Sequence, residues 1–227
     1  MTNEELNRRY TAQASWTKEL RDRVRAELPK GARVLELGCG TGAVMRAFNL
    51  ERVIGLDRDY SRLEFAGRRS PHAFAAGMAQ ELPFKSGSFD MVYCHYFLLW
   101  VDDADGILRE ARRVLKDKGR CCLLAEPCWD ELEASPAELY EAAKLQREAL
   151  IREGIDPAAG KKLPELLRSA GFGEIEYAAY RRSETQSAEY IRGEIRQIEA
   201  DTGISLNLAF QPGWSYYIPT YYAIAKK

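Results

Sequence analysis

Three alternating glycines beside a carboxylate form the stretch of this 227-residue chain that is best suited to bind a ligand. Gly38, Gly40 and Gly42 follow the apolar run "RVLEL", and Glu36 lies two residues before the first of them. Glycine adopts backbone angles that other residues avoid, and its missing side chain lets a ligand approach the main chain. When such a loop joins a strand to a helix, the free N–H groups of the helix face the ligand. The stretch therefore predicts a loop that binds a nucleotide-like cofactor.

Asp57 ends the next apolar run, "RVIGLD", and lies 57 − 38 = 19 residues after the first glycine. An acid about 20 residues after such a glycine is typical of a carboxylate that accepts hydrogen bonds from a ribose. Nicotinamide dinucleotides and S-adenosylmethionine both contain that ribose, and "GCGTGA" also fits the permissive dinucleotide pattern. The glycines and Asp57 alone therefore leave both classes of cofactor open.

Glu36 favours one of these two classes. A carboxylate at this place repels a pyrophosphate, whereas it favours a cationic ligand by about 1 kcal/mol or more. S-adenosylmethionine carries a sulfonium and an ammonium group, so its cationic methionine end explains the acid. The alternative role for Glu36 is that of a satisfied carboxylate that caps the loop.

Helix and strand signals alternate along the chain and would position these residues. Short apolar runs predict strands over 32–37, 52–57, 73–79, 89–96, 119–127, 173–180 and 215–227. Helical patterns cover 3–28, 41–48, 61–69, 102–115, 136–153, 160–172 and 187–200. Strands that alternate with helices predict a mostly parallel, doubly wound α/β sheet, in which ligands bind beyond the carboxyl ends of the strands.

Charge and composition narrow the partners of the protein. The 33 basic and 34 acidic residues are interspersed, with a formal net charge of −1, so no nucleic acid partner is expected. The start "MTNEELNRRY" lacks an apolar signal core, and the run at 91–101 is too short to span a bilayer. We therefore expect one cytoplasmic domain without a membrane partner.

The five cysteines predict small buried residues rather than a metal centre. They are odd in number and contain no CxxC pair. Zinc binding by some of them together with His95 is the alternative, but their spacing matches no common zinc site. We therefore predict no metal.

The motifs "VLELGCGTG", "GLD", "GMAQELPFKSGSFDMVY" and "LREARRVLKDKGR" resemble, in order and spacing, class I S-adenosylmethionine-dependent methyltransferases, in particular their small-molecule type 11 branch. The resemblance covers about residues 10–126. It implies a Rossmann-like, seven-stranded sheet whose last strand is antiparallel, with a small helical cap. It also implies S-adenosylmethionine as cofactor and S-adenosylhomocysteine as product.

The resemblance also assigns residues to parts of the cofactor. Asp57 would bind the ribose, Arg58 would flank the adenine, and Ala79 would offer a backbone amide to the ring. Relatives commonly have an acid at the position of Met78, where a thioether only packs on the ring, and Gln80 is the substitute. The contacts expected around the methionine portion are Glu36, Gly38, Gly40, Thr41 and Gly42, and Cys39 and Cys94 are further expected cofactor contacts.

Residues at two further places are expected at the site, one over the cofactor and one near the transferred methyl group. Tyr10 and Trp16 lie on a helix that covers the cofactor in relatives, with ordinary packing as the alternative. His95 follows the fourth strand and is the candidate general base, with a polar lining role as the alternative. Methyl transfer to an oriented acceptor also proceeds without a dedicated base, since the sulfonium is already activated.

The second half of the chain is predicted to cover the acceptor. Glu126 and Trp129 follow the fifth strand near the mouth of the site, and 153–163 is a lid or a plain connector. Tyr180, Arg181 and the aromatic residues of 214–217 line a pocket or belong to the core. The expected segments are an N-terminal helical cover (1–30), a cofactor-binding core (31–126), a helical cap insert (127–160) and the C-terminal part of the sheet (161–227).

Together these features predict methyl transfer from S-adenosylmethionine to a small organic acceptor. An adenosyl-cofactor-binding regulator or scaffold without transfer activity is the first alternative, and an NAD(P)-dependent oxidoreductase is the second. The acceptor molecule, its accepting atom and the oligomeric state stay open.

Overall fold

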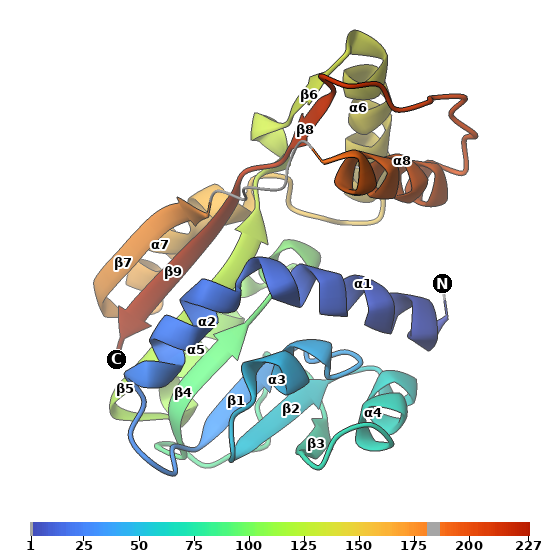
Figure 1. The fold of residues 1–227 in the computed structure, drawn as a ribbon. Coiled ribbons are helices and arrows are strands. Elements are labelled where there is room, and N and C mark those ends of the chain that lie inside the picture. The colour runs from blue at the N-terminus through green and yellow to red at the C-terminus, as the bar shows by residue number, and fades with distance from the viewer. Residues whose placement is uncertain (1, 181–186) are drawn as a thin grey trace.

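The computed structural model describes residues 2–180 and 187–227, in which helices and strands alternate (Figure 1). The strands are β1 (Val34–Leu37), β2 (Val53–Asp57), β3 (Ala73–Ala76), β4 (Phe89–Cys94), β5 (Leu115–Pro127), β6 (Glu133–Ser135), β7 (Gly173–Tyr180), β8 (Ser215–Tyr217) and β9 (Thr220–Lys226). The helices are α1 (Asn3–Trp16), α2 (Lys18–Ala26), α3 (Ala43–Phe48), α4 (Tyr60–Gly67), α5 (Ala104–Val114), α6 (Ala137–Arg152), α7 (Ala159–Ser169) and α8 (Ala188–Thr202), with short 3-10 turns η1 (Leu98–Trp100) and η2 (Trp129–Glu131). None of the helices in these ranges is long and apolar enough to cross a membrane.

Within the described residues, seven strands form one sheet in the order β3-β2-β1-β4-β5-β9-β7. The five strands from β3 to β5 pair in parallel, and β9 is antiparallel to both of its neighbours. Parallel neighbours require crossover connections, which the helices supply. The predicted doubly wound sheet with an antiparallel last strand is confirmed. The carboxyl ends of β1, β2 and β4 therefore meet at one edge.

Apolar side chains build a separate core on each face of the sheet. Phe48 of α3 belongs to one core, and Ile107 of α5 and Leu163 of α7 belong to the other. The neighbours Cys121 and Cys122 of β5 point into opposite cores, as consecutive strand residues must. All five cysteines are buried and free, so they pack as small apolar residues.

The helix predicted over 3–28 is divided into α1 and α2 at Thr17. At the start of α1, the side-chain amide of Asn3 donates to the carbonyl of Ser61, 3.2 Å away at the start of α4. At the division, the hydroxyl of Thr17 lies 3.0 Å from Nε2 of His95, just after β4. Helix α1 therefore crosses the carboxyl ends of the strands, where the site is expected.

A cap of α6, α8, β6 and β8 lies beyond the carboxyl end of β5 (Figure 1). The single strand predicted over 215–227 is divided, because β8 pairs with β6 in the cap whereas β9 joins the main sheet. Leu139 of α6, Ile191 of α8 and Tyr216 of β8 share the apolar core of the cap. The cap thus contains C-terminal elements in addition to the predicted insert.

Candidate active site

The glycine loop between β1 and α3 has a left-handed backbone. Gly38, Gly40 and Gly42 have φ angles of 66°, 50° and 71°. A Cβ atom on Gly38 would lie 2.2 Å from Cδ2 of Phe97, and one on Gly40 would lie 3.1 Å from Cε2 of Tyr10. The loop therefore requires glycine for its φ angles and also because the rings of Phe97 and Tyr10 pack against its backbone. The sequence suggested the unusual backbone angles and the approach of a ligand, but not the two rings.

Asp57 ties the end of β2 to the glycine loop. Its Oδ2 accepts a hydrogen bond of 2.7 Å from the backbone N–H of Gly40, and its Oδ1 accepts one of 2.9 Å from the N–H of Asp59. Each carboxylate oxygen has more than one lone pair, so both oxygens keep acceptor capacity for ribose hydroxyls. The structure thus brings the two parts of the predicted ribose motif into contact.

Glu36 is buried beneath the loop and faces β4. Its Oε2 accepts a hydrogen bond of 2.9 Å from the hydroxyl of Tyr93, which is its partner in the β1–β4 register. Burial raises the pKa of Glu36 to about 8, against the lowering effect of the Tyr93 hydrogen bond. A cationic ligand beside this carboxyl would favour its charged form. Glu36 is thus satisfied within the protein and also suited to a cation.

Glu36 should make the stability of the protein depend on pH. Between pH 4.5 and about 8 the unfolded chain releases this proton while the folded protein keeps it, so the free energy of unfolding falls as pH rises. We expect Glu36→Gln, whose amide oxygen still accepts from Tyr93, to flatten this fall by on the order of a few kcal/mol. Urea unfolding at a series of pH values measures the effect. Burial also raises the pKa of Glu126 to about 7. In both proteins this residue therefore contributes its own fall of the free energy of unfolding between pH 4.5 and about 7. Parallel stability curves for the two proteins would contradict the assignment.

Arg21 of α2 is a buried cation that the sequence interpretation missed. Its side chain is 3% exposed, and its Nε and Nη1 atoms have no hydrogen-bond partner among the described residues. The charge of Arg21 interacts electrostatically with Tyr93 and Glu36, the buried pair below the glycine loop. A buried charge without a paired partner is costly, so an anionic group bound here would stabilise it. The sequence does contain one signal for Arg21. This residue lies on the same helix face as Thr17, Leu20 and Val24, and the structure buries this face.

His95 is held against the division between α1 and α2. Its Nε2 lies 3.0 Å from the Thr17 hydroxyl, and its ring centroid lies 5.2 Å from that of Tyr96. Burial, together with a smaller effect of the Arg21 charge, lowers the pKa of His95 to about 3. The imidazole is therefore neutral at physiological pH and accepts a proton weakly. This environment favours the lining role over the base role.

The residues expected around the adenine follow β2 and β3, which are parallel neighbours. Arg58 and Gln80 are exposed, and Met78 is an exposed large apolar side chain, whereas Ala79 is buried. The strands end side by side at Asp57 and Ala76, so these segments leave the sheet at the same edge. Their exposure leaves the side chains accessible to a ring.

The side chains of Cys39 and Cys94 point into the core. Cys39 belongs to the apolar core beneath α3, and Cys94 belongs to the opposite core. The thiol of Cys94 donates to Oε1 of Glu126 at 3.7 Å. Only the main chains of these cysteines are therefore placed to meet a cofactor. Thr41 is also buried, and its hydroxyl has no hydrogen-bond partner among the described residues.

Aromatic rings join the end of α1 to the cap. The ring of Trp16 lies 6.3 Å from that of Tyr96 and 6.4 Å from that of Tyr190 in α8. Trp16 therefore faces the expected acceptor side, whereas Tyr10 contacts the glycine loop. Trp129 is buried in the cap core and Tyr180 packs on the core of the main sheet. Arg181 lies outside the described residues.

Residues 35–123 match the family model described as "Methyltransferase domain". The chain is also 31% identical over 173 residues to the demethylmenaquinone methyltransferase of Lactococcus lactis, an alignment that covers 65% of this chain and 68% of that protein. The chain belongs to the class I S-adenosylmethionine-dependent methyltransferases. For some other curated relatives of this methyltransferase, the chain spans less than half of their length.

Solved structures share the fold of this methyltransferase. A S-adenosylmethionine-dependent methyltransferase from Thermotoga maritima, described as a possible histamine N-methyltransferase, has a TM-score of 0.62 and 20% identity, covering 97% of this chain and 94% of that chain. The [4+2]-cyclase SpnF has a TM-score of 0.63 and 21% identity, covering 92% and 80%. At these identities the likeness shows the fold alone.

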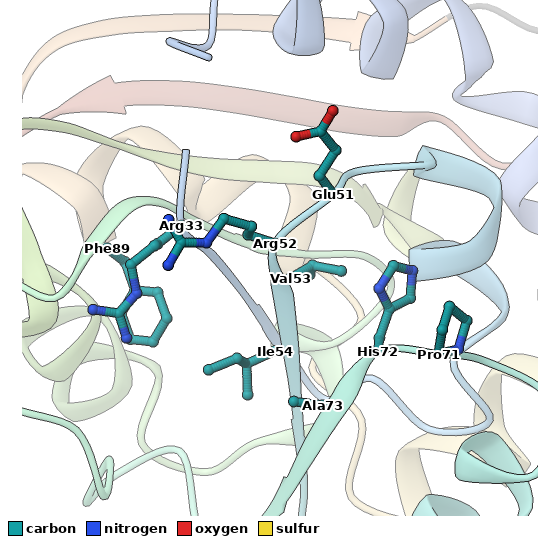
Figure 2. Close-up of a pocket in the computed structure, with 9 residues that line it drawn as sticks. All are labelled: Arg33, Glu51, Arg52, Val53, Ile54, Pro71, His72, Ala73 and Phe89. Carbon is teal, nitrogen blue, oxygen red and sulfur yellow. The ribbon is translucent and has the colours of Figure 1, made fainter. Parts of the chain in front are cut away.

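The pocket in Figure 2 lies at the edge of the sheet opposite to the glycine loop. It has a volume of about 300 Å³, and its lining includes Arg33, Arg52 and His72. These residues directly precede β1, β2 and β3, whereas the glycine loop and Asp57 come at the carboxyl ends. The pocket is therefore separate from the predicted site. In the described part of the chain, no group of three His, Cys, Asp or Glu side chains is placed to hold a metal ion.

Proposed function

We propose that this methyltransferase moves a methyl group from S-adenosylmethionine to a small organic acceptor and releases S-adenosylhomocysteine. The observation that carries the proposal is the placement of two buried carboxylates, Glu36 in β1 and Asp57 at the end of β2, next to the glycine loop at the carboxyl edge of the sheet. The family to which the chain belongs supports the same reaction. A small molecule as partner, rather than nucleic acid or a membrane, stays a prediction from the charge pattern.

The chemistry of the side chains around the loop fits the cofactor. The unpaired N–H groups of Arg21 suit the methionine carboxylate, and Glu36 suits the cationic methionine end. Asp57 keeps acceptor capacity for the ribose. Bound S-adenosylmethionine supplies a methyl group on a positively charged sulfur. The described residues of the protein would orient that group and exclude water from it.

The acceptor gives up a proton when its new bond to the methyl carbon forms and the bond from carbon to sulfur breaks. His95 is the candidate that the sequence offers for taking that proton, but its low pKa makes it a weak base. We infer that His95 instead holds α1 over the strands through Thr17. Orientation of the acceptor would then supply most of the rate.

Substitution of His95 separates these two roles. A general base contributes typically about 100-fold to 10,000-fold to the rate. We expect His95→Ala to lower turnover less than about tenfold and to lower the melting temperature. Thr17→Val, which removes the same hydrogen bond, is the matched control. A loss of about 100-fold or more in His95→Ala with little change in Thr17→Val would restore the base role.

Labelled methyl transfer tests the proposed reaction. The protein is incubated with methyl-labelled S-adenosylmethionine and a small-molecule extract, and label is measured in the low-molecular-weight products. In parallel, calorimetry compares binding of S-adenosylhomocysteine and NAD. Binding of the adenosyl ligand with transfer of label supports the proposal, and binding of NAD alone would overturn it. Membership of the methyltransferase family already opposes the NAD(P)-dependent oxidoreductase.

A second candidate is a protein that binds the adenosyl cofactor without transferring a methyl group. The [4+2]-cyclase SpnF shares this fold but is described by a different reaction. The fold alone therefore does not exclude this second candidate. Tight binding of S-adenosylhomocysteine without transfer to any extract would support this candidate over the first.

A further inference from the structure

Glu126 is a fully buried carboxylate with an unusual set of donors. It lies near the carboxyl end of β5 and is 0% exposed. Its Oε1 accepts hydrogen bonds of 2.9 Å from the backbone N–H groups of Phe97 and Leu98, and its Oε2 accepts one of 3.2 Å from that of Leu99. A buried carboxyl group is costly unless its oxygens are paired. One acid thus satisfies three successive N–H groups of the chain that follows β4.

The turn that Glu126 holds has a backbone that other residues rarely adopt. Tyr96 has a φ of 52° although it is not glycine, which costs on the order of 1 kcal/mol or more. Such a conformation persists only where its surroundings hold it. The three hydrogen bonds to Glu126 begin at the next residue, Phe97. They therefore oppose relaxation of the turn over 95–99.

Two rings of the same turn face different partners. The ring of Phe97 fills the space that a Cβ on Gly38 would occupy. The ring of Tyr96 approaches Trp16, and its hydroxyl lies 3.3 Å from the Thr220 hydroxyl at the start of β9. The position of the turn therefore sets the contact to the glycine loop on one side and to α1 and β9 on the other.

We propose that Glu126 is the positioning residue of this site: by holding the N–H groups of Phe97 to Leu99, it fixes Phe97 against the glycine loop and Tyr96 against the acceptor side. The inference rests on the proposed function, because the glycine loop matters here as the holder of the cofactor. Glu126 acts through the turn and contacts neither reactant. Removal of the Glu126 carboxylate should loosen the contact between Phe97 and the glycine loop while the fold persists.

The test compares Glu126→Gln with Glu131→Gln. Glutamine has one acceptor oxygen and presents an NH₂ group to the remaining N–H donors, so it cannot keep all three hydrogen bonds. Glu131 lies five residues further on and pairs with Lys161 at 2.6 Å and with the Tyr221 hydroxyl at 2.5 Å, but holds nothing of the turn. It is therefore a carboxylate control in the same segment.

We expect Glu126→Gln to weaken binding of S-adenosylhomocysteine about tenfold in calorimetry, and to speed amide hydrogen exchange at 97–99 by a similar factor. Glu131→Gln should leave both unchanged. Phe97→Leu should weaken binding too, and the double variant should lose less than the sum of the two, since both act through one contact.

The outcomes separate this inference from the proposed function. If the unaltered protein does not bind S-adenosylhomocysteine, the proposed function fails. If it binds and folded Glu126→Gln binds equally well, the positioning role is overturned. If Glu126→Gln does not fold, additive losses of Phe97→Leu and Tyr96→Phe, measured with the same ligand, would overturn it, and non-additive losses would support it.

Discussion

Asp57→Ala should weaken binding of S-adenosylhomocysteine by about 10-fold to 100-fold or more. The variant loses the predicted acceptor for ribose hydroxyls, and a hydrogen bond to a charged group contributes about 1.5–3 kcal/mol. Each 1.4 kcal/mol corresponds to about a factor of ten in affinity. The variant also leaves the N–H of Gly40 without its 2.7 Å partner, which loosens the glycine loop. Calorimetric titration measures the change.

The neighbouring acid Asp59 provides the control for this prediction. Its side chain caps α4 by accepting from the N–H groups of Ser61 and Arg62, and it also pairs with the Arg62 guanidinium at 3.0 Å. Asp59→Ala therefore removes a structural carboxylate from the same segment without touching the glycine loop. We expect it to lower stability by about 1 kcal/mol and to leave the affinity nearly unchanged. Equal affinity losses in the two variants would contradict the ribose assignment of Asp57.

The sheet was predictable because its signals are local. Short apolar runs between turn residues gave the strands, and the glycine loop and Asp57 gave the edge at which a ligand binds. Two divisions were missed for a different reason. No glycine or proline marks the division at Thr17, which is held by the contact with His95 from a distant part of the chain. Likewise β8 lies outside the main sheet because it pairs with β6 in the cap. Local patterns do not contain such pairings.

The candidate site divides in the same way. Glu36 and Asp57 could be proposed from the sequence because each stands at a characteristic spacing from the glycines. Arg21 was not predicted, because its neighbours in the sequence form an ordinary charged helix and only the fold buries it. The choice between the two roles of His95 could not be made from the sequence, because an imidazole titrates near neutrality unless burial lowers its pKa. His95 is buried where it meets Thr17, a residue that lies far away in the sequence.

Arg21→Leu should have opposite effects on stability and on binding. The guanidinium is buried, and two of its nitrogens lack hydrogen-bond partners among the described residues. Replacing such a charge by an apolar side chain removes a desolvation cost, so the melting temperature without ligand should stay equal or rise. If those nitrogens hold the methionine carboxylate, S-adenosylhomocysteine should bind about tenfold or more weakly, since a charge-assisted pair is lost.

A truncated ligand decides whether the effect of Arg21 is direct. 5′-Methylthioadenosine has the adenosine and the sulfur but lacks the amino and carboxylate groups. The substitution should therefore leave its affinity nearly unchanged while it weakens the full ligand. An equal loss for both ligands would mean that Arg21 supports the fold of the site rather than the carboxylate. Glu36→Gln should instead weaken S-adenosylmethionine, which carries an ammonium and a sulfonium, more than S-adenosylhomocysteine, which carries only the ammonium. The two variants thus assign the anionic and cationic parts of the methionine end to separate side chains.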